Sequence, residues 1–166
     1  MDARPILVTI ARLLEQHRLE AVLIGNAAAA LHGAPVTTLD FDFLFRKTPV
    51  NLRKLKALAR SLQAVVLRPY YPASGLYRVV RDADALQLDF MTAIDGIRSF
   101  NSLRSRASVV VFGGHSLLVA GLADIVRSKR AANRPRDRAV LEILEKTLHE
   151  KENAEKGQAG SPRPGK

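Results

Sequence analysis

The chain has 166 residues, of which 47% are hydrophobic, a formal net charge of +10 and no cysteine. This length suits one domain with a real core, and the lack of cysteine excludes a disulfide framework and a thiolate metal site. No apolar run approaches the roughly 18 residues of a membrane span, and the N-terminus has no signal-peptide layout, so we expect a cytoplasmic protein without membrane contact. The positive charge favours nucleic acid as a partner, although a basic surface that only aids solubility has the same composition.

The first elements lead to a glycine turn. Residues 5–18 predict an amphipathic helix, because their apolar side chains recur at helical spacing. The apolar run 22–24 ends at Gly25, as in a buried strand followed by a turn. Asn26 is then expected to cap the alanine-rich helix over 27–31.

A second strand carries two acids. Residues 39–45 alternate, with Phe41 and Phe43 on one side and Asp40 and Asp42 on the other. The two carboxylates therefore point the same way, roughly 6.5–7 Å apart along the strand, and they repel unless a cation lies between them. A hard cation such as Mg²⁺ prefers oxygen ligands and binds phosphate as well. For an isolated pair of this kind, two solvated acids on an edge strand are the more common explanation. The preceding glycine turn, whose N–H groups can hold phosphate, favours the metal.

The stretch from the glycine turn to the acidic pair resembles a known signature. Gly25-Asn26, followed by His-Gly-Ala-Pro-Val-Thr-Thr-Leu and Asp40-Phe-Asp42, is similar to the motif of the DNA polymerase β-like nucleotidyltransferase superfamily. More narrowly, it resembles the minimal bacterial nucleotidyltransferases, a group that includes abortive-infection toxins of type IV toxin–antitoxin systems. Asn26 stands where this family has Gly or Ser, and Val36 where it has Arg. The resemblance implies that Asp40 and Asp42 bind two Mg²⁺ ions, or Mn²⁺ in their place. It assigns nucleotide binding to Gly25, Asn26 and Thr38.

A basic stretch follows the acidic pair. Between Asp42 and Asp82 there is no acidic residue, whereas nine basic residues occur there: Arg46, Lys47, Arg53, Lys54, Lys56, Arg60, Arg68, Arg78 and Arg81. Such a run is usually a solvated face. Beside a metal site, it would form a phosphate-binding rim for the acceptor.

Within this stretch we expect a helix and a hairpin. Thr48 followed by proline predicts the start of a helix. Strands over 65–67 and 76–80 are joined by a turn that contains Tyr70 and Tyr71. Either tyrosine could stack on a nucleobase, although local packing at the hairpin is the more common role.

The next strand carries a third acid. Residues 85–93 alternate, with Asp89 on the face opposite Leu88 and Phe90. A lone charge in such an apolar strand is costly, which favours a functional role over that of a partly exposed acid. In the superfamily that the chain resembles, a third carboxylate comes from the strand beside the acidic pair. The resemblance thus implies that Asp89 completes the metal site and accepts the proton of the acceptor hydroxyl.

The C-terminal third holds a second motif. A helix over 97–107, a hairpin over 109–119 and a helix over 122–132 are expected, with Asn133 ending the last by a left-handed conformation. A Lys, an Arg and an Asp then match the C-terminal family motif, at Lys129, Arg134 and Asp137. The resemblance implies that the lysine is catalytic and places its charge on the triphosphate, and that the other two contribute to the nucleotide site. Asp137 is expected to orient one of the two cations.

The predicted fold is α/β, a mixed twisted sheet with packed helices and a C-terminal helical extension. One nucleotidyltransferase-like domain spans 1–150, with its catalytic core over about 20–93 and C-terminal helices over about 122–150. The last helix covers 138–149. Residues 151–166 predict a disordered tail, because they lack apolar spacing.

The favoured function is metal-dependent transfer of an NMP from an NTP to a hydroxyl acceptor, with RNA or tRNA favoured by the charge. A toxin role and a cognate antitoxin partner are implied only by the family. The alternative is a catalytically inactive module of the same fold that binds nucleic acid or regulates. Asn26 and Val36 favour that alternative, and the three carboxylates disfavour it. Transfer to a small molecule would require a closed pocket.

Overall fold

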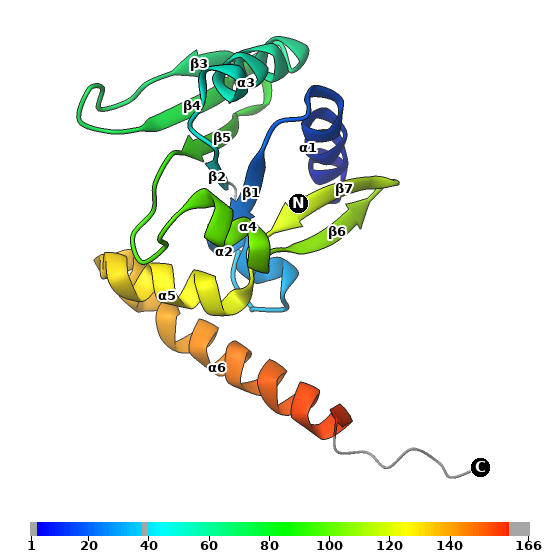
Figure 1. The fold of residues 1–166 in the computed structure, drawn as a ribbon, viewed down its shortest axis with the longest axis vertical. Coiled ribbons are helices and arrows are strands. Elements are labelled where there is room, and N and C mark those ends of the chain that lie inside the picture. The colour runs from blue at the N-terminus through cyan, green and yellow to red at the C-terminus, as the bar shows by residue number, and fades with distance from the viewer. Residues whose placement is uncertain (1–2, 38–39, 160–166) are drawn as a thin grey trace.

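The computed structural model describes residues 3–37 and 40–159 (Figure 1). The helices within these residues are α1 (Arg4–His17), α2 (Gly25–Leu31), α3 (Pro49–Ser61), α4 (Phe100–Arg106), α5 (Leu122–Ala132) and α6 (Pro135–Ala159). The strands are β1 (Ala21–Ile24), β2 (Phe41–Phe45), β3 (Val65–Leu67), β4 (Leu76–Arg81), β5 (Leu86–Met91), β6 (Ser108–Phe112) and β7 (His115–Val119).

These strands form one mixed sheet in the order β3-β4-β5-β2-β1-β7-β6. β2 runs antiparallel to β1 and parallel to β5, and β4 runs antiparallel to β5. The interior strand β1 is buried over its whole length, which explains its continuous run of apolar residues. The predicted α/β class with a mixed sheet and packed helices is confirmed.

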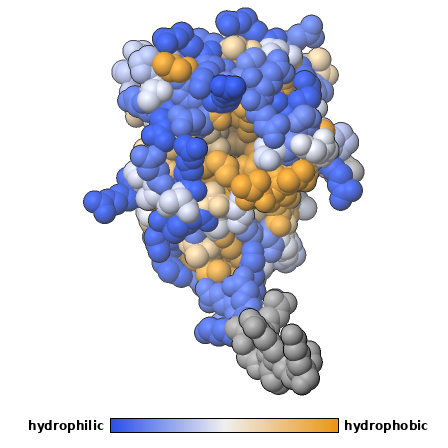
Figure 2. All heavy atoms as spheres, turned by 45° about the vertical axis from the view of Figure 1, so that its right-hand side comes forward, coloured by the Kyte–Doolittle hydropathy of each residue, from blue (hydrophilic) through white to orange (hydrophobic). Residues whose placement is uncertain are grey.

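Aromatic side chains form the core on one face of the sheet. The ring of Phe43 stacks on that of Phe90 at 4.9 Å, and Phe45 meets Phe90 and Tyr77 edge to face. Helices α1 and α3 contact each other, and α5 contacts α6. Figure 1 shows α3 at one end of the molecule and α5 with α6 at the other. On the face in Figure 2, hydrophilic residues cover the upper end, and apolar residues gather in the middle.

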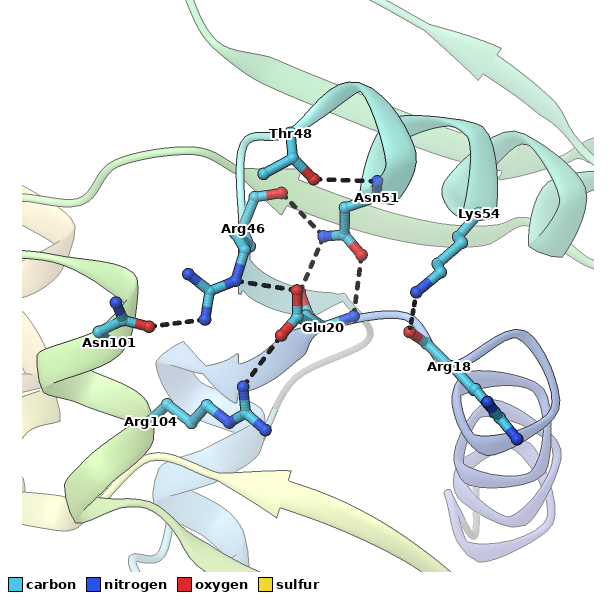
Figure 3. A network of polar contacts seen from close by, with 8 residues as sticks. All are labelled: Arg18, Glu20, Arg46, Thr48, Asn51, Lys54, Asn101 and Arg104. Carbon is cyan, nitrogen blue, oxygen red and sulfur yellow. Dashed lines mark hydrogen bonds and ion pairs between the residues drawn. The ribbon is translucent and has the colours of Figure 1, made fainter.

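A polar network fixes the start of β1 to its neighbours (Figure 3). The carboxylate of Glu20 accepts hydrogen bonds from Arg46 Nε at 2.8 Å and from Arg104 Nη1 at 2.9 Å. The backbone N–H of Glu20 donates to Asn51 Oδ1 in α3, and Asn51 is 1% exposed. Arg46 therefore has a structural role at the junction of β1, β2, α3 and α4.

Helix α2 begins at Gly25, two residues before the predicted start at residue 27, so the predicted cap at Asn26 is wrong. Gly25 has a φ of +68° and turns the chain directly from β1 into the helix, which places Asn26 in the first turn. No side chain caps this helix. The predicted caps at Thr48 and Asn133 are confirmed, the first by a bond from Asn51 N–H and the second by a φ of +50°.

The disordered tail predicted from residue 151 is wrong over 151–159, because α6 continues to Ala159. This segment has no apolar stripe, but it is rich in helix-forming Glu, Lys and Ala, and Glu152 and Lys156 have the favourable i,i+4 order. Lys151 Nζ also lies 2.7 Å from His32 Nδ1, which holds the helix against the residue after α2. Residues 160–166, the rest of the predicted tail, lie outside the described residues. None of the helices described is long and apolar enough to cross a membrane.

Candidate active site

One cleft of about 760 Å³ brings the predicted site residues together between the sheet and α5. Its lining includes all of them that the structure describes: Gly25, Asn26, Asp40, Asp42, Asp89, Lys129, Arg134 and Asp137. Thr38, the remaining predicted residue, lies outside the described residues. Residues from both motifs thus meet at one place, although about 90 residues of sequence separate them.

The sheet aligns three charged side chains across adjacent strands. Asp42 of β2 is the register partner of Asp89 in β5, and Asp89 is the register partner of Arg78 in β4. Adjacent strands lie about 4.8 Å apart and register partners point to the same face. The two carboxylates and the guanidinium therefore form a row on the cleft face of the sheet.

Asp89 is held by Arg78 at both of its oxygens. Arg78 Nε donates to Oδ1 at 2.8 Å and Nη2 donates to Oδ2 at 3.1 Å, a two-pronged contact that matches the planar guanidinium. Gln87 Nε2 donates a longer hydrogen bond to Oδ2, at 3.4 Å. Asp89 is only 8% exposed, so this ion pair is what makes its burial tolerable.

Asp42 lies in the middle of the acidic group. Burial and the nearby negative charges of Asp89 and Asp40 together raise the pKa of Asp42 to about 6, while Lys129 and Arg136 oppose this rise. The carboxylate of Asp42 is thus a group that a cation in the cleft would stabilise.

Lys129 and Arg134 share one buried carboxylate. Asp137 is 1% exposed and accepts bonds from Arg134 Nε at 2.6 Å and from the Arg134 backbone N–H at 3.1 Å. Lys129 Nζ lies 3.8 Å from the other oxygen, and burial lowers the pKa of this lysine. Asp137 therefore contacts both cations of the second motif, in a position to orient each of them.

The turn after β1 approaches Asp42 closely. A Cβ atom on Gly25 would lie 3.1 Å from Asp42 Oδ2, and the positive φ of Gly25 also disfavours any other residue. Next to it, Asn26 Oδ1 is buried and has no hydrogen-bond partner among the described residues. A buried acceptor without a donor is rare and calls for a partner that is not a protein group.

The donors at the cleft suit Mg²⁺ or Mn²⁺ by their chemistry. Carboxylates of Asp40, Asp42 and Asp89 and the amide oxygen of Asn26 are all oxygen ligands, which these cations prefer. As the side chains lie, no group of three acidic or histidine residues in the described part of the chain is close enough to hold a metal ion. Arg78 takes both oxygens of Asp89. A shared metal site thus requires these side chains to move together.

The basic rim predicted from residues 46–81 does not surround the cleft. Of those nine basic residues, Arg78 is the one among its lining residues. Lys54 bonds to the carbonyl of Arg18, and α3 exposes Arg53 and Arg60 at the far end of the sheet from α5 (Figure 1). The sequence shows the charges but not the packing of α3 against α1, which carries them away from the site.

Sequence reasoning missed the role of Arg78 and two further lining residues. Arg136 acts on the charge of Asp42 and lines the cleft. Asp124 also lines it, 4% exposed, with Arg106 Nη2 at 2.9 Å, so its role is to tie α5 to α4. Of these three, only Arg78 was named from the sequence, as one of the nine basic residues, and its pairing with Asp89 depends on the register of β4 with β5.

No family model matches the chain, and no curated protein sequence matches it. Solved structures do resemble it. The lincosamide antibiotic adenylyltransferase LnuA, with lincomycin bound, has a TM-score of 0.60 at 11% identity, over 84% of this chain and 94% of that one. ANT(2″)-Ia in complex with adenylyl-2″-tobramycin has a TM-score of 0.58 at 14% identity, over 87% of each chain. An antigenic nucleotidyltransferase-like protein from Paracoccidioides brasiliensis has 0.56 at 14%, over 86% and 74%. The chain thus has the nucleotidyltransferase fold.

Proposed function

We propose that this protein is a metal-dependent nucleotidyltransferase that moves an NMP from an NTP to a hydroxyl group of RNA or tRNA. The observation that carries the proposal is the single cleft in which Gly25, Asp42, Asp89 and Lys129 meet. A phosphate-binding turn, carboxylates on one face and a buried lysine are the parts that this chemistry needs.

The order of the strands supports a division of the cleft. The turn at Gly25 follows β1, beside Asp42 in β2, and Lys129 is close enough to act on the charge of Asp42. We assign the triphosphate to this side, with Gly25 and Asn26 at its oxygens and Lys129 as a positive charge on it. Arg134 is held by Asp137 and supports the same side.

In the reaction, the acceptor oxygen bonds to the α-phosphorus, the bond to the bridging oxygen breaks, and pyrophosphate leaves. Asp40, Asp42 and Asp89 would hold Mg²⁺ or Mn²⁺, which would supply positive charge for the phosphate oxygens and lower the pKa of the attacking hydroxyl. Asp89 would accept the hydroxyl proton in competition with the two hydrogen bonds that it receives from Arg78. Asp137 keeps Lys129 oriented throughout.

A toxin role with a cognate antitoxin partner is the narrower form of this proposal. It is supported by the resemblance of residues 25–42 to the type IV toxin group. A cytoplasmic location agrees with that role.

Transfer to a small-molecule hydroxyl is a second candidate, favoured by the charge of the cleft itself. The lining holds four cationic residues, Arg78, Lys129, Arg134 and Arg136, against six aspartates, Asp40, Asp42, Asp89, Asp95, Asp124 and Asp137. Two structural neighbours carry adenylyl-tobramycin and lincomycin. The whole chain is basic, but the lining of the cleft has more acidic than basic residues, so a cationic acceptor would suit it.

One incubation separates these candidates from the inactive module. The protein is mixed with each α-labelled NTP and Mg²⁺, together with total RNA in one arm and a panel of aminoglycosides and lincosamides in the other. Label in RNA supports the favoured acceptor, and label in a small molecule supports the second candidate. If no NTP gives a labelled product with Mg²⁺ or Mn²⁺, the inactive module that binds nucleic acid explains the fold, with Asn26 and Val36 as its cause.

A further inference from the structure

We propose that Tyr70, at the mouth of the cleft, stacks on an unpaired nucleobase of the acceptor, so that the acceptor is a single-stranded nucleic-acid end. This inference rests on the proposed function and specifies its substrate. It begins from the two tyrosines of the β3–β4 connection, which the sequence treats as equivalent.

The structure gives these two tyrosines different surroundings. The guanidinium of Arg68 lies 4.4 Å from the ring centroid of Tyr71 and 4.2 Å from that of Tyr77. Tyr71 is 65% exposed, but its ring already has a partner in Arg68. Tyr70 is 75% exposed and lines the cleft, and within the described residues no aromatic ring or guanidinium stacks on it.

The backbone holds Tyr70 in this place. Its φ is +64°, a left-handed conformation that a bulky residue rarely adopts. The carbonyl of Tyr70 accepts bonds from Ala73 N–H at 2.7 Å and from Ser74 N–H at 3.2 Å, and these bonds close the turn. Such a conformation persists where the surroundings fix it, and residues of this kind are concentrated at ligand sites.

The position of Tyr70 assigns it to the acceptor rather than to the NTP. The cleft face runs from the turn after β1, through Asp42 in β2 and Asp89 in β5, to Arg78 in β4. Tyr70 lies in the turn that leads into β4, the strand that carries Arg78, and both residues line the cleft. It thus lies at the Arg78 edge, whereas Gly25 and Lys129 lie at the other. In an in-line displacement, the attacking and leaving groups lie on opposite sides of the phosphorus.

Charge and shape at this edge suit a nucleic-acid end. Arg68, which is exposed beside Tyr71, and Arg78 within the cleft can bind phosphates. Neither the β3–β4 turn nor β4 carries an acidic residue. An aromatic ring beside arginines is the usual platform for an unpaired base, since stacking accepts any base. Paired bases in a duplex cannot reach such a ring.

The test measures binding in EDTA without NTP, so it does not depend on transfer. The probe is a fluorescein-labelled single-stranded oligoadenylate, with a matched abasic ribose-phosphate oligomer of equal charge as the second probe. Tyr70→Ala should weaken oligoadenylate binding about tenfold, as expected for one lost stacked base, and leave the abasic oligomer unchanged. Tyr70→Phe keeps the ring and should bind as the wild type does. Tyr71→Ala is the matched control and should lose less than twofold.

Several results would overturn the inference. They are an unchanged affinity of Tyr70→Ala for oligoadenylate, an equal loss in Tyr71→Ala, and an equal loss for the abasic oligomer. Titration of each NTP with Mg²⁺ distinguishes the source of the base. If Tyr70→Ala weakens NTP binding and spares oligoadenylate, the base belongs to the NTP and the acceptor assignment is wrong. If Tyr70→Ala weakens oligoadenylate binding but the wild type transfers no NMP, the proposed function is wrong and the base-stacking role of Tyr70 still holds.

Discussion

Arg78 and Asp89 face each other across β4 and β5, with Arg78 Nε 2.8 Å from Oδ1 and Nη2 3.1 Å from Oδ2 of the carboxylate. The guanidinium of Arg78 thus binds the carboxylate of Asp89, which is one of the three proposed metal ligands. A cation in the cleft would compete with Arg78 for Asp89, and Asp89 would then turn from Arg78 toward Asp42. On this hypothesis, Arg78 stabilises the protein without metal at the expense of metal affinity.

Removing Arg78 should separate these two effects. Arg78→Met leaves a nearly buried carboxylate without its partner, so the free energy of unfolding in EDTA should fall by about 1–3 kcal/mol. The rise in melting temperature on adding Mg²⁺ should be larger than in wild type, because the metal no longer competes with a guanidinium. Arg81→Met is the control, since Arg81 also pairs with an aspartate, Asp84, but neither residue lines the cleft. An Mg²⁺ shift that is no larger in Arg78→Met than in wild type would contradict the competition.

Asp42 should make stability depend on pH in a defined direction. Its folded pKa of about 6 lies above the ordinary value of 3.8, so the folded protein binds a proton that the unfolded chain releases between these values. The charged carboxylate therefore costs stability above pH 6, and this cost disappears as the pH falls toward 4. In EDTA, Asp42→Asn should be more stable than wild type at pH 7.5, by on the order of 2–3 kcal/mol, and nearly equal at pH 4.

A control with the opposite sign checks this pH assignment. Arg81 lowers the pKa of Asp84 through a hydrogen bond, so Asp84→Asn should lose stability at neutral pH instead of gaining it. Urea unfolding of the three proteins across this pH range gives the comparison. A stability difference between Asp42→Asn and wild type that does not change with pH would mean that Asp42 is not the group described.

Lys129 should matter for transfer and not for RNA affinity. Lys129→Ala removes one positioned charge from the triphosphate side, so the transfer rate should fall about 10²–10³-fold. RNA affinity comes from many exposed basic groups and should change less than twofold. Arg130→Ala is the control, because Arg130 is exposed and pairs with Glu145 at the surface. Equal loss of transfer in the two variants would remove Lys129 from the site.

Lys151 should help to hold the C-terminal part of α6 through its contact with His32. Burial lowers the pKa of His32, and the positive charge of Lys151 lowers it further, so the ring is neutral at pH 7 and can accept from Lys151 Nζ. Lys151→Met should raise the pKa of His32, as measured by NMR, while the free energy of unfolding changes by less than about 1 kcal/mol. Lys156→Met should leave the His32 pKa unchanged. A shift of equal size in both variants would show that the contact is not specific.

The sequence predicts those features of the site that depend on strand alternation and on the residues at helix ends. Strand parity puts Asp42 and Asp89 on one face, and the register of β2 with β5 has them side by side. The left-handed end of α5 at Asn133 and the start of α6 at Pro135 depend on single residues, which the sequence shows directly.

What the sequence does not predict depends on packing between distant elements. The pairing of Arg78 with Asp89 requires the β4–β5 register, and the difference between Tyr70 and Tyr71 requires the position of Arg68. The helix over 151–159 has no apolar stripe, so its formation depends on the helix propensity of its residues and on the contact of Lys151 with His32.

The central claim is that this cleft breaks the bond between the α- and β-phosphates of an NTP and keeps the NMP. The most direct measurement compares α-³²P- and γ-³²P-labelled NTPs, with Mg²⁺ and total RNA, for wild type and Asp42→Asn. Label from the α-position should appear in RNA and label from the γ-position should appear only in pyrophosphate, and Asp42→Asn should show neither. Transfer of the γ-label, or equal α-labelling by wild type and Asp42→Asn, would contradict the account.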